Sequence, residues 1–149
     1  MMLSEHFSLL ELVQSDIAAR YGIDNNPTTA IIARLKKLAA LLEHVRTLLN
    51  EPLSVSSGYR CPALNSLVKG ASNSAHLLGA AADFTASAFG SPLVVSKAIL
   101  ASAIPFDQLI YEYGRWVHLS IPATGSPARR MVMTKYLNQP YRLGLLTFA

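Results

Sequence analysis

The segment from Ser57 to Asp83 reads SGYRCPALNSLVKGASNSAHLLGAAAD, and its second half brings a histidine and a carboxylate close together in the chain. His76 follows a run of small polar residues, which predicts an exposed loop. Asp83 lies within the apolar run AAADFTA, which is typical of a central strand buried on both faces. Because a buried carboxylate is costly unless it is paired or binds a cation, Asp83 indicates a candidate functional site.

A second histidine, His118, lies in the run WVHLSI, whose composition predicts a strand. Two imidazoles and one carboxylate form a ligand set for catalytic zinc, which leaves the fourth tetrahedral position open. Taken alone, His76 fits a solvated loop residue, Asp83 a helix cap and His118 a half-exposed strand residue. Their combination in one pattern favours a metal site. His6 and His44 lack such neighbours, and we interpret them as structural or solvated.

The motif SAHLLGAAAD, which ends at Asp83, together with the later His118 resembles the zinc D-Ala-D-Ala carboxypeptidases of peptidase family M15. The resemblance covers about residues 54–121, and the start of the chain is also similar to small bacterial and phage-encoded members. It implies that His76, Asp83 and His118 bind Zn²⁺.

The resemblance also implies two substrate-binding residues. Arg60 matches the arginine with which the family holds a substrate carboxylate, and a planar guanidinium can bind a carboxylate through two parallel hydrogen bonds. Ser74 matches the serine that helps to hold the peptide; without the motif, both would be interpreted as ordinary surface residues. Cys61 stands where relatives often have Ser or Thr, and we expect a small buried thiol because a fourth protein ligand would close the open zinc position.

The catalytic base is where this sequence departs from the family pattern. Many relatives carry an acidic residue three positions before the last histidine, where this chain has Arg115. Glu112 is the alternative base, and its spacing to His118 resembles that of the hedgehog domain, which shares the metal site. If the hairpin loop spans Tyr113 to Arg115, Glu112 lies opposite Trp116 on the His118 face, whereas a two-residue loop turns it away. A structural interpretation is a hairpin-end charge paired with Arg115.

The composition bounds the class of protein. The chain has 149 residues, of which 51% are hydrophobic and 15% charged, so we expect one folded domain with an N-terminal helical part (1–50), a metal-site core (53–121) and a C-terminal segment (122–149). The net charge is +4, but no Lys/Arg run is long enough to resemble a nucleic-acid-binding arm, so no nucleic-acid partner is expected. The single cysteine excludes an intramolecular disulfide. The N-terminus lacks a basic region, and no apolar run reaches the ~20 residues of a membrane span, so neither a secretion signal nor a span is expected.

Helix signals dominate the first third of the chain, and strand signals follow. Ser8 and Glu11 have the spacing of a capping box, and apolar residues from Thr29 onward recur at helical steps. The other expected elements are helices over 16–20, 63–68 and 91–103, strands over 53–57, 80–86, 109–113, 116–121 and 131–136, and a loop at Asn25-Asn26-Pro27. This order predicts an α+β domain with helices packed on one face of a small mixed or antiparallel sheet.

The resemblance implies a zinc metallopeptidase that hydrolyses peptidoglycan stem peptides, as a D,D-carboxypeptidase or an endopeptidase, with Glu112 as the base. Without a signal peptide, it would be made in the cytoplasm and reach the cell wall after release by a phage lysis system. The alternative is a zinc-stabilised binding or virion structural module without turnover, which the departure at Arg115 favours. A nucleic-acid-binding role rests on net charge alone, and the oligomeric state is left open.

Overall fold

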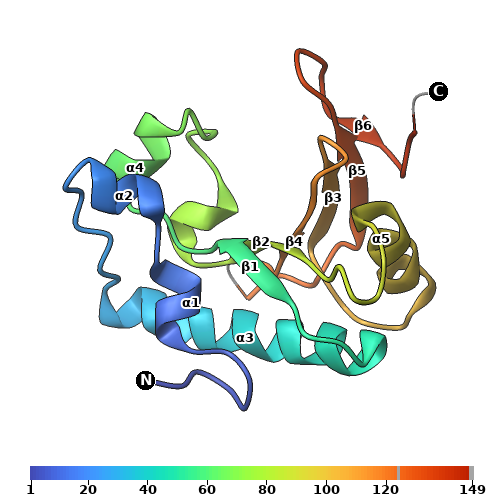
Figure 1. Cartoon of the computed structure of the whole chain (residues 1–149), viewed down its shortest axis with the longest axis horizontal. Helices are drawn as coiled ribbons and strands as arrows, with labels where there is room; N and C mark the ends of the chain where they lie inside the picture. The colour runs from blue at the N-terminus through green and yellow to red at the C-terminus, as the bar shows by residue number, and fades with distance from the viewer. Residues whose placement is uncertain (124, 148–149) are drawn as a thin grey trace.

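The elements follow one another along the chain much as the sequence predicts, and Figure 1 shows them in the computed structural model. The structure describes residues 1–123 and 125–147; Thr124, Phe148 and Ala149 of the expected C-terminal segment lie outside this range. The elements are α1 (Leu9–Val13), α2 (Asp16–Arg20), α3 (Thr29–Leu49), β1 (Ser54–Ser57), α4 (Pro62–Leu67), the 3-10 helix η1 (Ala75–Leu78), β2 (Ala81–Thr85), α5 (Pro92–Ala101), β3 (Gln108–Glu112), β4 (Trp116–Ser120), β5 (Met131–Lys135) and β6 (Arg142–Leu143). Within the described part of the chain, no helix is both long and apolar enough to span a bilayer.

Short-range signals account for the helix boundaries. The Ser8 hydroxyl accepts a hydrogen bond from the Glu11 backbone N–H, and the Glu11 carboxylate accepts one from the Ser8 backbone N–H, so the predicted capping box begins α1. Helix α3 begins after Thr28, whose side chain accepts a hydrogen bond from the Ile31 N–H. It ends where Asn50 adopts a left-handed backbone with φ of 53°.

The six strands form one sheet in the order β1-β2-β4-β3-β5-β6. All neighbouring strands are antiparallel except β3 and β5, so the sheet is mixed and the expected α+β fold class is confirmed. Strand β6 was not predicted. It consists of two exposed residues, and the Thr134 hydroxyl of β5 donates a hydrogen bond to the carbonyl of Gly144 just after it. A strand this short has no pattern of its own in the sequence.

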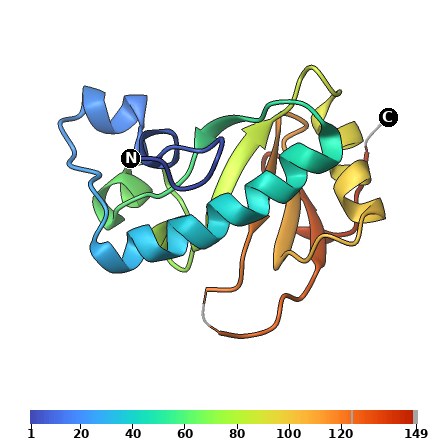
Figure 2. The ribbon, with the colours of Figure 1, turned by 90° about the horizontal axis from the view of Figure 1, so that it is seen from below.

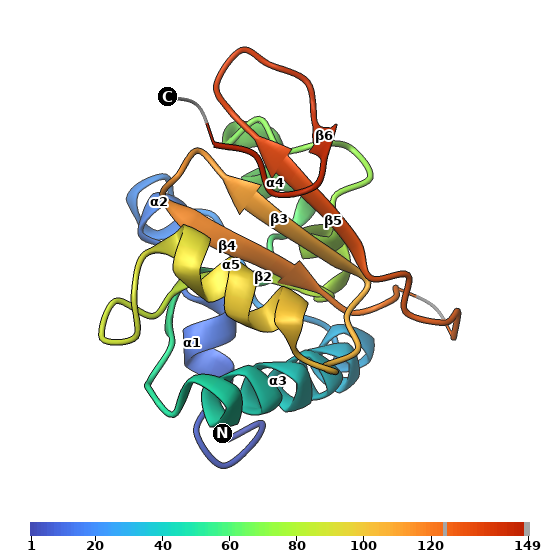
Figure 3. The same cartoon turned by 90° about the vertical axis from the view of Figure 1, so that its right-hand side faces the viewer.

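Helices α3 and α5 pack against one face of the central strands, as the views in Figures 2 and 3 show. Their buried side chains form the core together with Phe84 of β2 and with Val117 and Leu119 of β4. Because successive side chains of a strand point to opposite faces, Asp83 and His118 project from the other face. On that face the short elements α4 and η1 border a cleft.

Candidate metal centre

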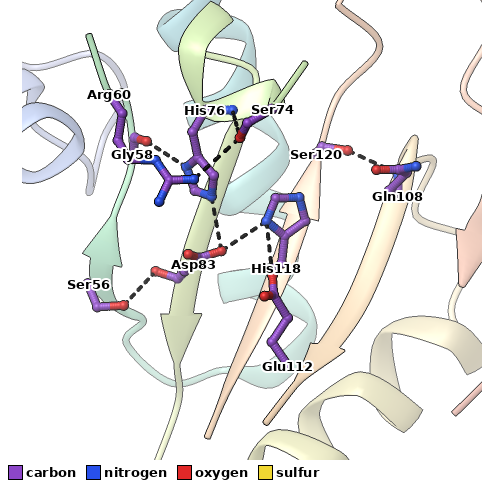
Figure 4. Close-up of polar contacts among 10 residues, drawn as sticks. All are labelled: Ser56, Gly58, Arg60, Ser74, His76, Asp83, Gln108, Glu112, His118 and Ser120. Atoms are coloured by element: carbon purple, nitrogen blue, oxygen red, sulfur yellow. Dashed lines mark hydrogen bonds and ion pairs between the residues drawn. The ribbon is translucent and has the colours of Figure 1, made fainter. Parts of the chain in front are cut away.

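Strands β2 and β4 place two of the predicted ligands side by side. Asp83 pairs with His118 across the antiparallel strands, so both side chains project from the same face. The 3-10 helix η1 brings His76 to them, and Figure 4 shows the three side chains converging. Asp83 Oδ1 lies 2.9 Å from His118 Nδ1 and 3.3 Å from His76 Nε2. One ligand atom from each residue lies within 4.8 Å of the others, so the structure brings the three predicted residues together.

The prediction that His76 lies in an exposed loop is wrong. His76 belongs to η1 and only 2% of its surface is exposed, because η1 packs on β2 and its imidazole contacts the His118 ring. His76 Nδ1 lies 2.7 Å from the carbonyl oxygen of Gly58. A carbonyl oxygen only accepts hydrogen bonds, so Nδ1 carries a proton, and Nε2, which faces Asp83, is the ring nitrogen that is left for a metal ion. This is the arrangement of a metal-binding histidine oriented by a backbone carbonyl.

The charge state of Asp83 also fits a metal ligand. Burial alone would raise the pKa of this carboxyl group, but the electrostatic attraction and the hydrogen bonds of the His76 and His118 side chains outweigh burial and lower the pKa below its ordinary range. Asp83 is therefore a carboxylate at neutral pH. A buried carboxylate and two imidazoles with converging ligand atoms match the donors of a catalytic metal site. His76, Asp83 and His118 could thus hold a divalent metal ion.

The hairpin between β3 and β4 decides where Glu112 points. Glu112 pairs with Trp116, so the loop consists of Tyr113, Gly114 and Arg115. Tyr113 and Gly114 adopt positive φ values of 58° and 67°, and the Arg115 backbone N–H donates a hydrogen bond to the Glu112 carbonyl. This is the longer of the two loops left open by the sequence. It places Glu112 on the face of the metal centre, with Oε1 3.5 Å from His118 Nδ1. The Arg115 side chain is exposed.

The surroundings of Glu112 raise the pKa of its carboxyl group above the ordinary value. Burial raises the pKa of Glu112, the negative charge of Asp83 raises it further, and His118 and Arg60 partly oppose both effects. The pKa is about 7, against an ordinary value of 4.5. A carboxyl group with a pKa near neutrality can both accept and release a proton at physiological pH, which is what a general base requires.

Arg60 lies on the other side of the metal centre, next to Ser74 (Figure 4). Its Nη2 donates a hydrogen bond of 3.3 Å to the Ser74 hydroxyl oxygen, which also accepts one from the His76 backbone N–H. Its Nε is buried and has no hydrogen-bond partner among the described residues. Burial lowers the pKa of the guanidinium, and the charges of Asp83 and Glu112 oppose that shift, so Arg60 stays protonated. The group therefore has donors available for an anionic ligand.

The comparison with known families agrees with this geometry. The family model described as Peptidase M15 matches residues 5–120. The chain belongs to the peptidase M15 family. Membership implies a metal-dependent peptidase, and the matched region contains every predicted site residue. Comparison with curated proteins found no match.

In this M15 peptidase the metal centre lies within a cleft of about 990 Å³. The rings of Tyr113 and Trp116 form part of its wall, with centroids 5.2 Å apart in an edge-to-face contact. Tyr141 and Met133 line the same cleft, although both lie beyond the part of the chain that the family model matches. Sequence reasoning missed these two residues, because a single tyrosine or methionine outside a motif has no local signature.

Cys61 differs from its prediction in one respect. We expected a buried thiol, but Cys61 is half-buried because it occupies the N-cap position of α4, at the surface end of the helix. Its side chain makes no capping hydrogen bond. Within the described residues, Cys61 is not part of the cluster of converging ligand atoms, so the structure gives it no place as a metal ligand.

Proposed function

We propose that this M15 peptidase is a zinc enzyme that hydrolyses the stem peptides of peptidoglycan, as a D,D-carboxypeptidase or an endopeptidase. The observation that supports this most directly is the position of Glu112. Its carboxylate lies 3.5 Å from His118 Nδ1, on the strand next to the buried His76–Asp83–His118 cluster and inside the cleft. A ligand set with a carboxyl group beside it, in a cleft, is the arrangement that metal-assisted hydrolysis needs.

His76, Asp83 and His118 would hold Zn²⁺, which supplies a Lewis acid for the scissile carbonyl and makes a nearby water more acidic. Glu112 would accept the proton of that water at its carboxylate and later pass a proton to the leaving amine. A divalent cation near Glu112 favours its carboxylate form, so the base is ready at neutral pH. The rings of Tyr113 and Trp116 line this part of the cleft.

Arg60 would set the direction in which the peptide substrate lies in the cleft. Among the described residues its Nε has no hydrogen-bond partner, and its Nη2 donates to Ser74, so the guanidinium keeps donors for a substrate carboxylate. Stem peptides have free carboxylates at their C-terminus and within the chain. A terminal carboxylate at Arg60 corresponds to carboxypeptidase action, and an internal one corresponds to endopeptidase action.

Its site of action follows from the substrate. We propose that the enzyme is made in the cytoplasm and acts at the cell wall after release by a phage or prophage lysis system, as the likeness to phage-encoded members suggests. The net charge of +4 suits work on an anionic wall polymer.

The test is incubation of the zinc-loaded protein with purified muropeptides, followed by mass spectrometry. Loss of a terminal alanine is expected for a carboxypeptidase, and two peptide fragments are expected for an endopeptidase. Glu112→Gln should bind zinc and leave the muropeptides intact. If the wild-type protein with full zinc changes no muropeptide, the proposal fails and a zinc-stabilised binding or virion structural module takes its place.

A further inference from the structure

Asn25, in the loop between α2 and α3, makes three hydrogen bonds with its side-chain amide. Its Nδ2 donates to the carbonyl oxygens of Val13 at 2.7 Å and Tyr59 at 3.0 Å. Its Oδ1 accepts from the backbone N–H of Cys61 at 2.8 Å. Two of the three bonds therefore go to the residues that directly precede and follow Arg60. The Asn25 amide therefore holds the backbone on both sides of Arg60.

Residues 58–61, which include Arg60, are also hydrogen-bonded to His76. The Gly58 carbonyl lies 2.7 Å from His76 Nδ1, and the Arg60 backbone N–H donates a hydrogen bond of 3.0 Å to the His76 carbonyl. On its other side the segment packs tightly on the end of α1. The Tyr59 N–H donates to the Leu12 carbonyl, and a Cβ atom at Gly58 would clash with that same carbonyl. Any shift of this segment would move both the His76 ring and the Arg60 side chain.

The segment lies between β1 and α4, where neither element supplies all of its hydrogen bonds. Strand β1 ends at Ser57 and α4 starts at Pro62, so the carbonyl of Tyr59 and the N–H of Cys61 depend on other partners. An Asn side chain carries both a donor and an acceptor and can satisfy the two groups together. A side chain that carried only a donor or only an acceptor could not satisfy both the Tyr59 carbonyl and the Cys61 N–H.

We infer that Asn25 is a positioning residue, which fixes segment 58–61 and thereby sets both the orientation of His76 toward the metal and the placement of the Arg60 guanidinium. The part that concerns Arg60 rests on the proposed carboxylate-binding function. The part that concerns His76 rests on the hydrogen bonds alone. In the part of the chain that the structure describes, Asn25 is neither one of the converging ligand residues nor one of the residues that line the cleft.

The test compares Asn25→Asp with Asn26→Asp. Asp has the size of Asn and keeps the acceptor for Cys61, but it replaces the donor that faces the carbonyls of Val13 and Tyr59 with an acceptor. Asn26 is the exposed neighbour, and its contact with Asp24 uses the backbone N–H, so Asn26→Asp adds the same charge and removes none of these bonds. Zinc affinity is measured by competition with a coloured chelator. Asn25→Asp should bind zinc about tenfold more weakly, as for other changes that disturb the partner of a ligand histidine. Asn26→Asp should stay within about twofold of wild type.

The second readout is binding of a stem-type peptide with a free C-terminal carboxylate and of the same peptide as its amide. It is measured by calorimetry on zinc-loaded protein that carries Glu112→Gln in every variant, so that the peptide is not cleaved during the measurement. Asn25→Asp should reduce the preference for the peptide acid over the peptide amide. In protein that already carries Arg60→Ala, adding Asn25→Asp should cause no further loss of this preference. A double-mutant cycle separates this coupling from a general loss of stability. If wild type shows no preference for the acid, the proposed role of Arg60 fails, and zinc affinity alone decides the role of Asn25.

Unchanged zinc affinity and an unchanged acid preference in Asn25→Asp would overturn the inference, even if the variant melts at a lower temperature. Equal effects of Asn25→Asp and Asn26→Asp would also overturn it, because charge and not bonding would then be the cause. If Asn25→Asp does not fold, Asn25→Ala serves instead. It removes the same bonds without adding a charge, and it should show the same losses relative to Asn26→Ala.

Discussion

Replacing Glu112 with glutamine should stabilise the metal-free protein at pH 8 while it abolishes most of the peptidase activity of the zinc-loaded protein. Both effects follow from the loss of one carboxyl group. Burial and the neighbouring Asp83 carboxylate make its charged form unfavourable in the metal-free protein, and the same group is the proposed base. Its pKa is about 7 in the folded protein against an ordinary value of 4.5. Glutamine keeps the size of the side chain and cannot take the charge.

The sign follows from proton binding. Between pH 4.5 and about 7 the folded protein holds a proton on Glu112 that the unfolded chain has released, so the free energy of unfolding falls as the pH rises through this range. The loss is complete above pH 7. At ~1.4 kcal/mol per pKa unit, a pKa raised from 4.5 to about 7 corresponds to about 3 kcal/mol. Glu112→Gln should therefore gain about this amount at pH 8 and almost nothing at pH 4, where the wild-type side chain is protonated in both states.

The assay is urea unfolding at pH 4 and pH 8 with a chelator present, together with kcat/KM for the zinc-loaded enzyme at pH 7. Loss of a positioned base should cost activity by about 10² to 10⁴-fold. Asp107→Asn is the matched control, because Arg129 donates two side-chain hydrogen bonds to Asp107, of 2.8 and 3.0 Å. These bonds lower the pKa of Asp107 against the opposing effect of burial. Its carboxylate therefore stabilises the fold above its ordinary pKa, so Asp107→Asn should lose stability at pH 8 and affect activity far less.

Two results would refute this reasoning. If Glu112→Gln gains as much stability at pH 4 as at pH 8, the gain does not come from removal of a charge. If Glu112→Gln cleaves muropeptides as fast as wild type, Glu112 is not the base. If Glu112→Gln is fully active and Asp107→Asn is inactive, Asp107 takes the role of the base.

Three further predictions concern the metal, the substrate and the fold. Wild type should contain about one zinc per chain and His118→Ala should lose most of it by elemental analysis; equal zinc in wild type and in alanine variants of all three ligands would contradict the metal site. Arg60→Lys should reduce kcat/KM on carboxylate-bearing stem peptides with unchanged zinc content, since the charge stays but the bidentate geometry is lost; unaltered kinetics would make Arg60 a surface residue. Arg130 donates to carbonyls in the last turn of α5 and just after it, and its guanidinium carbon lies 4.7 Å from the Phe106 ring centroid. Arg130→Ala should therefore cost about 1–2 kcal/mol in urea unfolding, whereas the exposed Arg115→Ala should be neutral.

Local signals were sufficient wherever the physics acts over a few residues. The capping box at Ser8 and the left-handed Asn50 set helix ends through hydrogen bonds within one turn of the chain. The apolar spacing after Thr29 predicted the buried face of α3 because side chains three and four residues apart share one side of a helix. Asp83 stood out because an apolar strand does not keep a carboxylate without a partner.

The sequence by itself thus determined the helices, most of the strands and the three residues that converge at the candidate metal centre. The tertiary structure decided the rest. His76 is buried because η1 packs on β2, Glu112 faces the metal centre because of the length of one hairpin loop, and Tyr141 reaches the cleft from outside the matched region. Burial, strand register and long-range hydrogen bonds such as those of Asn25 depend on residues far apart in the chain, so no local pattern contains them.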